Sequence, residues 1–433
     1  MTRVLPQAGP PSDAVPPPGP SVATSVAPFP RTADGGWFIQ WSLLGLFAIY
    51  AFLHVIYTAG FAPANMYYAS FAVLLVVCAT RMAWVVVIRR RSLSEVHFIR
   101  SFGVLVGASA VLVIVSWIKE YNALELLTWT APGQVFYILA PGLIALCVVN
   151  TASVKLLDLY VLILLARYAL YFVLAFSSDL SLSSVTMISW SSSSSPFESS
   201  FAHDLLIIEA YFVFRNRRVL ALVSAGMTML SLKRASFLLA PALLVGSRWL
   251  RSERPASRRY LYALAILGVA SPFVVMYAYS PGFVGYLYER FGIDVNAITT
   301  GRLQIYQVVT GILPETTGFG SLNQMLTMFV DSQFGTSWNS LLHNDTLRVY
   351  LEVGIIGFAA YMCALVYLGR SSRIASVLIT YTVFVLITSR LITHTSYWVV
   401  LFLVLALVER WIHERKVADK QEGSDVGREL QPR

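Results

Sequence analysis

The sequence has few charged residues and few cysteines for its length. Only 13% of its 433 residues are Asp, Glu, Lys or Arg, whereas soluble globular proteins carry about 25%. Hydrophobic residues make up 57% of the chain, and the mean hydropathy is +0.66. The three cysteines lie in apolar runs, which excludes a disulfide framework and a zinc site of recognisable spacing. This composition excludes an ordinary soluble enzyme and indicates an integral membrane protein.

Long polar segments are confined to the two ends of the chain. Residues 1–36 contain nine of the 19 prolines and almost no apolar periodicity, so they predict a disordered, Pro-rich cytoplasmic tail. This segment lacks the basic start and short apolar core of a cleavable signal peptide. Residues 417–433 are polar as well and predict a second cytoplasmic tail. We therefore expect the functional part of the protein to lie between these tails.

The rest of the chain is a series of apolar runs, and about 20 apolar residues are needed to span a bilayer as a helix. We predict an all-α, polytopic membrane protein with about 12 transmembrane helices, with 10 as the lower limit. Helices one to nine lie in 37–280, a large outer loop in 281–342, and the last three helices in 343–416. The predicted spans are 37–57, 62–88, 101–118, 134–149, 156–176, 201–214, 219–232, 235–250, 260–280, 343–368, 374–393 and 395–411.

The distribution of basic residues predicts the orientation of these spans. If the N-terminus is cytoplasmic and the spans alternate, the inner connections contain eighteen Lys and Arg residues and the outer connections five. Such a bias follows the positive-inside rule and places both termini in the cytoplasm. The net charge of +9 is thereby explained without a nucleic-acid partner.

Several cations gather at the predicted outer ends of the spans, where a charged group near the bilayer centre costs about 2.5–3.5 kcal/mol. One explanation is mutual pairing: Glu352 follows Arg348 by four residues and can share a helix face with it, and Asp204 and Glu209 are candidate partners for others. The alternative is an anionic ligand, because arginine matches phosphate oxygens bidentately. The cations are Lys233, Arg234, Arg302, His343, Arg348, Arg390 and His394, together with Arg167, which lies in the middle of its span or slightly outside it.

Two further histidines, His54 and His203, lie near outer helix ends, and we interpret them as packing residues at the membrane interface. The sequence contains no HExxH motif, no closely spaced carboxylates in the outer loops and no Cys/His cluster. We therefore predict no metal site and no cofactor. Any phosphate chemistry would then depend on arginine.

Four short segments occur in a recognisable order. They read Thr299-Thr300-Gly301-Arg302, Gly318-Phe319-Gly320, His343-Asn344-Asp345-Thr346-Leu347 and Glu352-Val353-Gly354-Ile355-Ile356-Gly357. This order resembles the superfamily of O-antigen ligases and O-antigen or exopolysaccharide polymerases, with its (S/T)GR, GxG, HNxxL and ExGxxG segments. Ser231-Leu232-Lys233-Arg234-Ala235-Ser236 is similar to an upstream segment of that family, with Lys233 where a serine is common.

The resemblance implies a membrane glycosyltransferase that inverts the sugar configuration at the outer face of the bacterial inner membrane. It implies a glycan donor on undecaprenyl diphosphate and a glycolipid acceptor, with membrane lipid and a chain-length regulator protein as further partners. His343 is the candidate base, because an imidazole titrates near neutral pH. Arg302 and Arg234 are the candidate catalytic cations for the departing diphosphate.

The resemblance and the residue types also suggest supporting roles for other side chains. Lys233, Asn344, Arg348, Arg390 and His394 are candidate substrate-binding residues. For the two glycines of the ExGxxG segment, we expect close helix packing.

The resemblance leaves the reaction open between a polymerase and a ligase, because both use the same donor. We favour a polymerase; a ligase would pass the finished glycan to lipid A core or another acceptor. A flippase or exporter of lipid-linked sugars is a further alternative. The absence of convincing internal repeats and the clustering of polar residues at one end of the spans argue against transport.

Overall fold

The computed structural model is a bundle of helices, and the residues it describes contain no strand. The chain is thus an all-α, polytopic membrane protein, as predicted. The described residues are 36–90, 93, 96–122, 129–177, 202–231, 234–298, 303–311, 318–322, 325–326 and 342–429.

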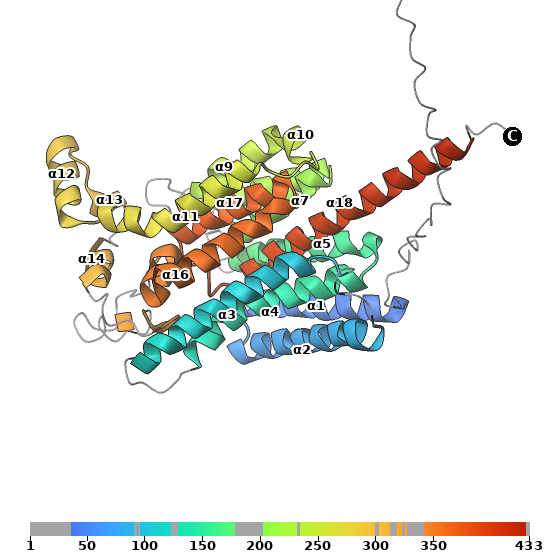
Figure 1. Cartoon of the computed structure of the whole chain (residues 1–433), viewed down its shortest axis with the longest axis horizontal. Coiled ribbons are helices and arrows are strands. Elements are labelled where there is room, and N and C mark those ends of the chain that lie inside the picture. Colours follow the sequence, from blue (N-terminus) through green and yellow to red (C-terminus); the bar gives the residue numbers. More distant parts are fainter. Residues whose placement is uncertain are drawn as a thin grey trace, which may run out of the picture.

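Every one of the twelve apolar ranges forms a helix (Figure 1). The helices are α1 Trp37–Thr58, α2 Ala64–Ala83 with a π-helical turn at Trp84–Ile88, α3 Ile99–Asn122, α4 Thr130–Thr151, α5 Val154–Ser177, α7 Ala202–Phe214, α8 Arg218–Leu230, α9 Arg234–Val245, α10 Ser247–Leu250, α11 Arg258–Ala278, α12 Pro281–Phe291, α13 Val295–Ile298, α14 Leu303–Gly311, α16 Asp345–Leu368, α17 Arg373–Thr388 and α18 Thr395–Glu429. The helix α18 continues past the apolar run that predicts it.

Eight of these helices are long and apolar enough to cross a membrane by length and composition: α1, α2, α3, α4, α5, α11, α16 and α18. The helices α7, α8, α9 and α17 are shorter. A helix of 13 residues such as α7 rises only about 20 Å, against a hydrocarbon thickness of about 30 Å. All the side chains of α7 are buried, and this helix packs against α8, α9 and α18. Twelve crossings therefore remain a prediction.

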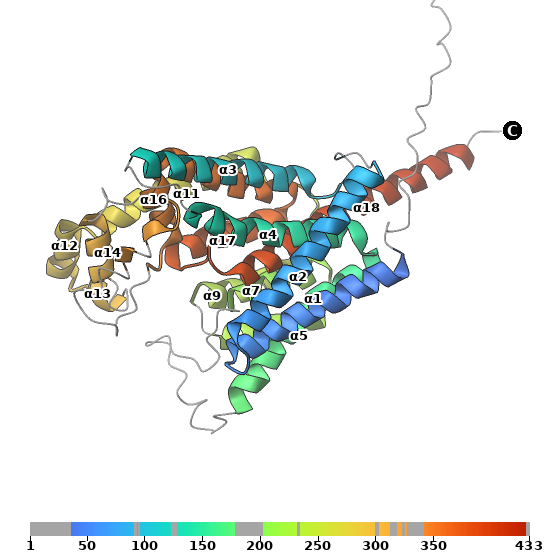
Figure 2. The ribbon, with the colours of Figure 1, turned by 90° about the horizontal axis from the view of Figure 1, so that it is seen from below.

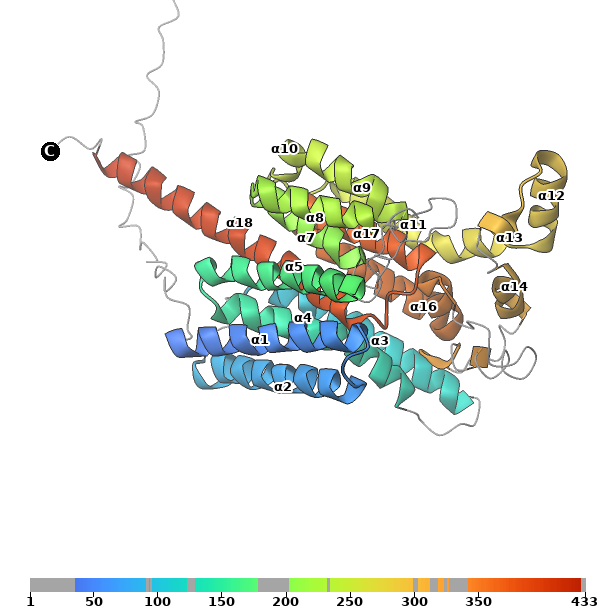
Figure 3. The same ribbon diagram turned by 180° about the vertical axis from the view of Figure 1, so that it is seen from behind.

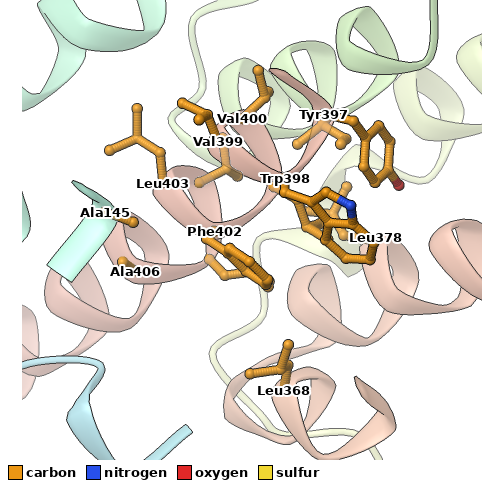
Figure 4. Close-up of a cluster of buried hydrophobic side chains, with 14 of the residues drawn as sticks. Ala145, Leu368, Leu378, Tyr397, Trp398, Val399, Val400, Phe402, Leu403 and Ala406 are labelled. Carbon is orange, nitrogen blue, oxygen red and sulfur yellow. The ribbon is translucent and has the colours of Figure 1, made fainter. Parts of the chain in front are cut away.

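The centre of the bundle is the first half of α18, which packs on α4 and α7 (Figures 1 and 3). Its side chains from Tyr397 to Val408 are all buried. Trp398 stacks on Phe402 with ring centroids 5.5 Å apart, and its indole N–H donates to the carbonyl of Ile392, 3.1 Å away (Figure 4). This apolar centre fixes the loop that joins α17 to α18.

The two ends of the bundle differ. The helices α12, α13 and α14 lie at one end, while the second half of α18 projects from the opposite end (Figure 1). The helix α12 begins at Pro281, where the Ser280 side chain accepts from the Phe283 N–H, and ends at Gly292 in a left-handed conformation. Figure 2 shows α3 alongside α16, and α1 grouped with α2 and α5. Three of the candidate functional residues, His343, Asn344 and Arg348, lie at the start of α16.

Candidate functional site

The helix α16 begins with an asparagine cap. The carboxamide oxygen of Asn344 accepts hydrogen bonds from the Leu347 N–H (2.8 Å) and the Thr346 hydroxyl (2.9 Å). This arrangement satisfies one of the backbone donors that every helix leaves unpaired at its start. The Asn344 side chain is buried and its oxygen is used within the protein. The geometry therefore favours a structural role for this predicted substrate-binding residue.

The next residue, Asp345, ties α16 to the loop between α17 and α18. Its carboxylate accepts from the backbone N–H groups of Leu391 and Ile392, and it pairs with the Arg348 guanidinium at 3.4 Å. Asp345 is fully buried, so this carboxylate depends on these donors for its stability. The contact fixes the backbone next to Arg390, 45 positions along the chain.

Arg348 is fully buried and surrounded by protein partners. It pairs with Glu352 at 3.4 Å, which confirms the predicted pairing on one helix face, and donates to the Gln134 side-chain oxygen at 3.1 Å. Glu352 in turn accepts from the Leu322 N–H at 3.0 Å. With both carboxylates in place, Arg348 is neutralised within the protein. The geometry favours a structural role for Arg348 over the predicted contact with substrate.

The GxG turn at 318–320 fits between α3 and α4. Gly320 has a positive φ of 99°, and a Cβ atom there would lie 2.7 Å from the Gln134 side chain. The N–H of Phe319 donates to the Ser116 hydroxyl at 2.9 Å, and the Phe319 ring lies 5.9 Å from the Arg348 guanidinium. Glycine is required here both for the backbone angle and for the close approach. The turn thus adds Phe319 to the residues that surround Arg348.

Inside α16, Gly354 interrupts the helix with φ 72° and ψ −177°, a conformation open essentially to glycine alone. A Cβ at Gly354 would meet nothing within 4 Å, so the expected role in close packing is wrong for this residue. Gly357 does lie close to its neighbours, Leu112 on α3 among them. The Lys119 ammonium donates to the carbonyls of Leu351 (3.3 Å) and Glu352 (2.9 Å). Lysine thus satisfies carbonyls that precede the interruption.

The buried residues Asn344, Asp345, Arg348 and Glu352 form a framework of hydrogen bonds and ion pairs at the start of α16. His343 directly precedes this framework in the chain and is only partly buried. Its carbonyl accepts from the Tyr306 hydroxyl at 3.4 Å, and Tyr306 stacks on Tyr279 with ring centroids 4.2 Å apart. Tyr306 belongs to α14, so this helix contacts the backbone of His343, and Tyr279, which follows α11, packs on Tyr306. The predicted base therefore lies where the loop helices meet α16.

The first turn of α9 is anchored to α17 and α7 through side-chain contacts. The Ser236 hydroxyl lies 2.6 Å from the Tyr381 hydroxyl, and His203 Nδ1 lies 2.8 Å from the same oxygen. His203 is therefore part of a buried polar network, which its interpretation as a packing residue did not include. Arg234 is the first residue of α9, but its side chain lies outside the described part of the structure.

Two of the predicted site residues, Lys233 and Arg302, lie outside the described residues. Arg302 directly precedes α14 in the sequence.

The neighbour of His203, Asp204, leads to a pocket through a buried chain of polar groups. Its carboxylate pairs with Arg167 at 2.6 Å, and Arg167 Nη1 lies 3.4 Å from His54 Nδ1. Asp204 is thus confirmed as a partner for a buried cation. His54 lines the pocket as well, so it has a polar environment that its interpretation as a packing residue did not include. Sequence reasoning missed this role because nothing local to His54 indicates Arg167.

The pocket has a volume of about 640 Å³ and lies where the end of α1 and the starts of α2 and α4 meet the α17–α18 loop. Arg390 and His394, both predicted to bind substrate, line it together with His54. Gln134 lines it too, and its side chain accepts from Arg348. The pocket is therefore in contact with the framework that surrounds Arg348.

Arg390 is the cation of this pocket. Its Nε donates to the Thr393 hydroxyl at 3.0 Å, and in the described part of the chain no carboxylate lies within salt-bridge distance of it. Burial, and next the positive charge of Arg348, lower the pKa of the Arg390 guanidinium, while Asp345 raises it. A bound anion would offset this unfavourable environment.

We also searched the described residues for a possible metal site. Across the described ranges, no three His, Cys, Asp or Glu side chains form a group that could hold a metal ion. In the pocket, the groups able to bind a ligand are the imidazoles of His54 and His394 and the guanidinium of Arg390. Such groups suit an anion or a hydroxylated ligand.

A comparison with protein families found a match in the region that contains the four motifs. A model of the O-antigen ligase family matches residues 219–362, a minority of the chain. This match confirms the resemblance for the region from α8 to the middle of α16. It includes Arg234, Arg302 and His343 and excludes Arg390 and His394. A search of curated proteins gave no match.

Proposed function

We propose that this protein is a membrane glycosyltransferase that extends a polysaccharide of the O-antigen or exopolysaccharide type. It would pass a growing glycan from undecaprenyl diphosphate to the next lipid-linked repeat unit. The observation that carries this proposal is the family match, because the matched residues 219–362 contain His343, Arg234 and Arg302. A ligase, which passes the glycan to lipid A core or another acceptor, is the alternative that the match equally allows.

In the proposed reaction, an acceptor hydroxyl oxygen attacks the anomeric carbon, and the bond from that carbon to the diphosphate oxygen breaks with inversion. His343 accepts the hydroxyl proton. The departing diphosphate gains negative charge, and Arg302 and Arg234 stabilise it. The chemistry needs no metal when arginines supply this charge.

The surroundings of His343 support its role. The polar side chains that follow it, Asn344, Asp345 and Arg348, are all occupied by contacts within the protein. His343 precedes this rigid segment, and its backbone is held by Tyr306. A backbone held in this way limits the positions that the imidazole can reach, which favours a defined approach to a substrate.

We propose that the protein lies in the bacterial inner membrane with both termini in the cytoplasm and the active site facing the periplasm. The basic bias of the inner connections supports this orientation. Lys233, Arg390 and His394 would then contact the lipid-linked substrate from the periplasmic side.

The experiment that tests the proposal is the length distribution of surface polysaccharide in a deletion strain, measured beside the extracted lipid-linked intermediates. A polymerase predicts single repeat units on the acceptor or the carrier. Full-length polymer on undecaprenyl diphosphate would show a ligase instead. Intermediates that accumulate facing the cytoplasm would contradict both enzymes and favour a transporter, and wild-type polysaccharide would contradict the proposal altogether.

A further inference from the structure

The pocket beside α1 has a lining that is polar and aromatic throughout. Four of its twelve lining residues are tyrosines, namely Tyr57, Tyr67, Tyr68 and Tyr137, and no aliphatic side chain is among them. Binding an acyl or polyprenyl chain would require apolar walls, because burial of apolar surface drives such binding. The volume of about 640 Å³ lies within the range of about 300–1,000 Å³ that is usual for small-molecule sites. The lining favours a polar ligand.

Three of these tyrosines, Tyr57, Tyr67 and Tyr68, form a continuous wall with His54. Tyr67 stacks on His54 at 4.6 Å and on Tyr57 at 5.4 Å between ring centroids, and Tyr68 lies 5.0 Å from Tyr67. Aromatic faces carry partial negative charge, which attracts the polarised C–H groups on one face of a pyranose ring. Tyrosine hydroxyls and imidazoles can donate to and accept from sugar hydroxyls. This wall therefore suits a sugar.

The charge of the pocket is unbalanced. Arg390 lines it, and no Asp or Glu is among the described residues that do. Asp345 already binds Arg348 and two backbone N–H groups, and Asp204 pairs with Arg167. A ligand with its own negative charge would complete the pairing of Arg390.

We propose that this pocket is a glycan subsite that takes an acidic sugar, such as a hexuronate, with its carboxylate on Arg390 and its ring against the tyrosine wall. The proposal rests on the proposed function for the presence of a glycan. It goes further in naming the class of sugar and in using residues outside the family match. Arg390 and the tyrosines would then determine specificity, while the matched region performs the transfer.

The test is binding of two matched tetrasaccharides to the purified full-length protein in lipid nanodiscs, measured by calorimetry. One is cellotetraose, and the other is the β-1,4-linked tetramer of glucuronic acid, which differs only in its carboxylates. We expect the acidic sugar to bind at least about tenfold more tightly. Arg390→Gln should abolish this preference, and Tyr68→Ala should weaken both sugars. Arg248→Gln, an exposed arginine on α10, is the matched control and should bind as wild type.

Equal binding of the two sugars, binding of neither, or a preference that survives Arg390→Gln would overturn the proposal. Inorganic pyrophosphate is the third probe: if it displaces the acidic sugar and its own binding is lost in Arg390→Gln, the pocket is a diphosphate site instead. The binding assay does not require the enzyme to react, so a negative binding result would contradict the subsite without contradicting the proposed glycan transfer. Conversely, a deletion strain with normal polysaccharide would contradict the transfer without changing the binding result.

Discussion

The start of α16 and the loop between α17 and α18 each contain an arginine, and the two arginines have opposite surroundings. Arg348 is fully buried between Asp345 and Glu352, whereas no acidic side chain is among the described residues that line the pocket of Arg390. Burial, and next the positive charge of Arg348, lower the pKa of Arg390. A buried cation that is fully paired stabilises one conformation, while a cation without a carboxylate partner is available to a ligand. The comparison indicates that Arg348 belongs to a structural framework, whereas Arg390 belongs to a binding surface, the pocket beside α1.

The framework should be sensitive to loss of Asp345. Asp345→Ala removes the acceptor for Leu391 and Ile392 and leaves Arg348 with one carboxylate, so we expect a loss of about 3–5 kcal/mol of unfolding free energy. Thermal unfolding in detergent would measure this loss. Asp419→Asn, an exposed carboxylate on α18, is the control expected to change little. A wild-type transition in Asp345→Ala would show that the framework does not depend on this carboxylate.

The interruption of α16 should be the next most sensitive position. Gly354→Ala forces a side chain into a backbone conformation that only glycine adopts readily, at a cost of about 1–3 kcal/mol. Gly45→Ala in α1 has open space for the methyl group and should stabilise its helix by about 0.5–1 kcal/mol. The same unfolding assay distinguishes the two, and equal effects would contradict the account of Gly354.

Loss of the Lys119 ammonium should have a smaller effect. Lys119→Met keeps the length of the side chain but leaves the carbonyls of Leu351 and Glu352 without their donor, at a cost of about 1–2 kcal/mol. Lys155→Met, at the first turn of α5, is the comparison variant and should unfold as wild type. If both variants unfold alike, Lys119 does not support the interruption.

The binding surface should behave in the opposite way. Arg390→Gln loses one hydrogen bond to Thr393 and no ion pair among the described residues, so unfolding should change by less than about 0.5 kcal/mol. Glycan transfer by the same preparation should fall severalfold or more. If Arg390→Gln unfolds at a lower temperature than wild type and also loses transfer, Arg390 has a structural role like that of Arg348. This result would contradict the contrast between the two arginines.

The sequence predicts the helices well because long apolar runs separated by basic loops leave few alternatives. It also predicts the Arg348–Glu352 pair, since a spacing of four residues places both on one helix face. Both predictions use only local spacing along the chain.

Contacts between distant residues were not predictable in this way. Asp345 binds the backbone at 391–392, and Gln134 brings α4 to Arg348. The tyrosine wall gave no signal either, because Tyr67 and Tyr68 lie near a helix start, where aromatic residues are common at membrane interfaces. Among the residues of the pocket, only Arg390 and His394 were predicted to bind substrate, because they are cations at the predicted outer end of a span.

The most direct test of the account measures unfolding and transfer together in purified His343→Ala, with an undecaprenyl-diphosphate-linked repeat unit as donor and acceptor. Because His343 is only partly buried and precedes the Asn344 cap of α16, we predict a near-wild-type unfolding transition and a loss of product of at least about a hundredfold. Lys155→Ala should keep full activity. Normal product from well-folded His343→Ala would contradict the assignment of this histidine as the base.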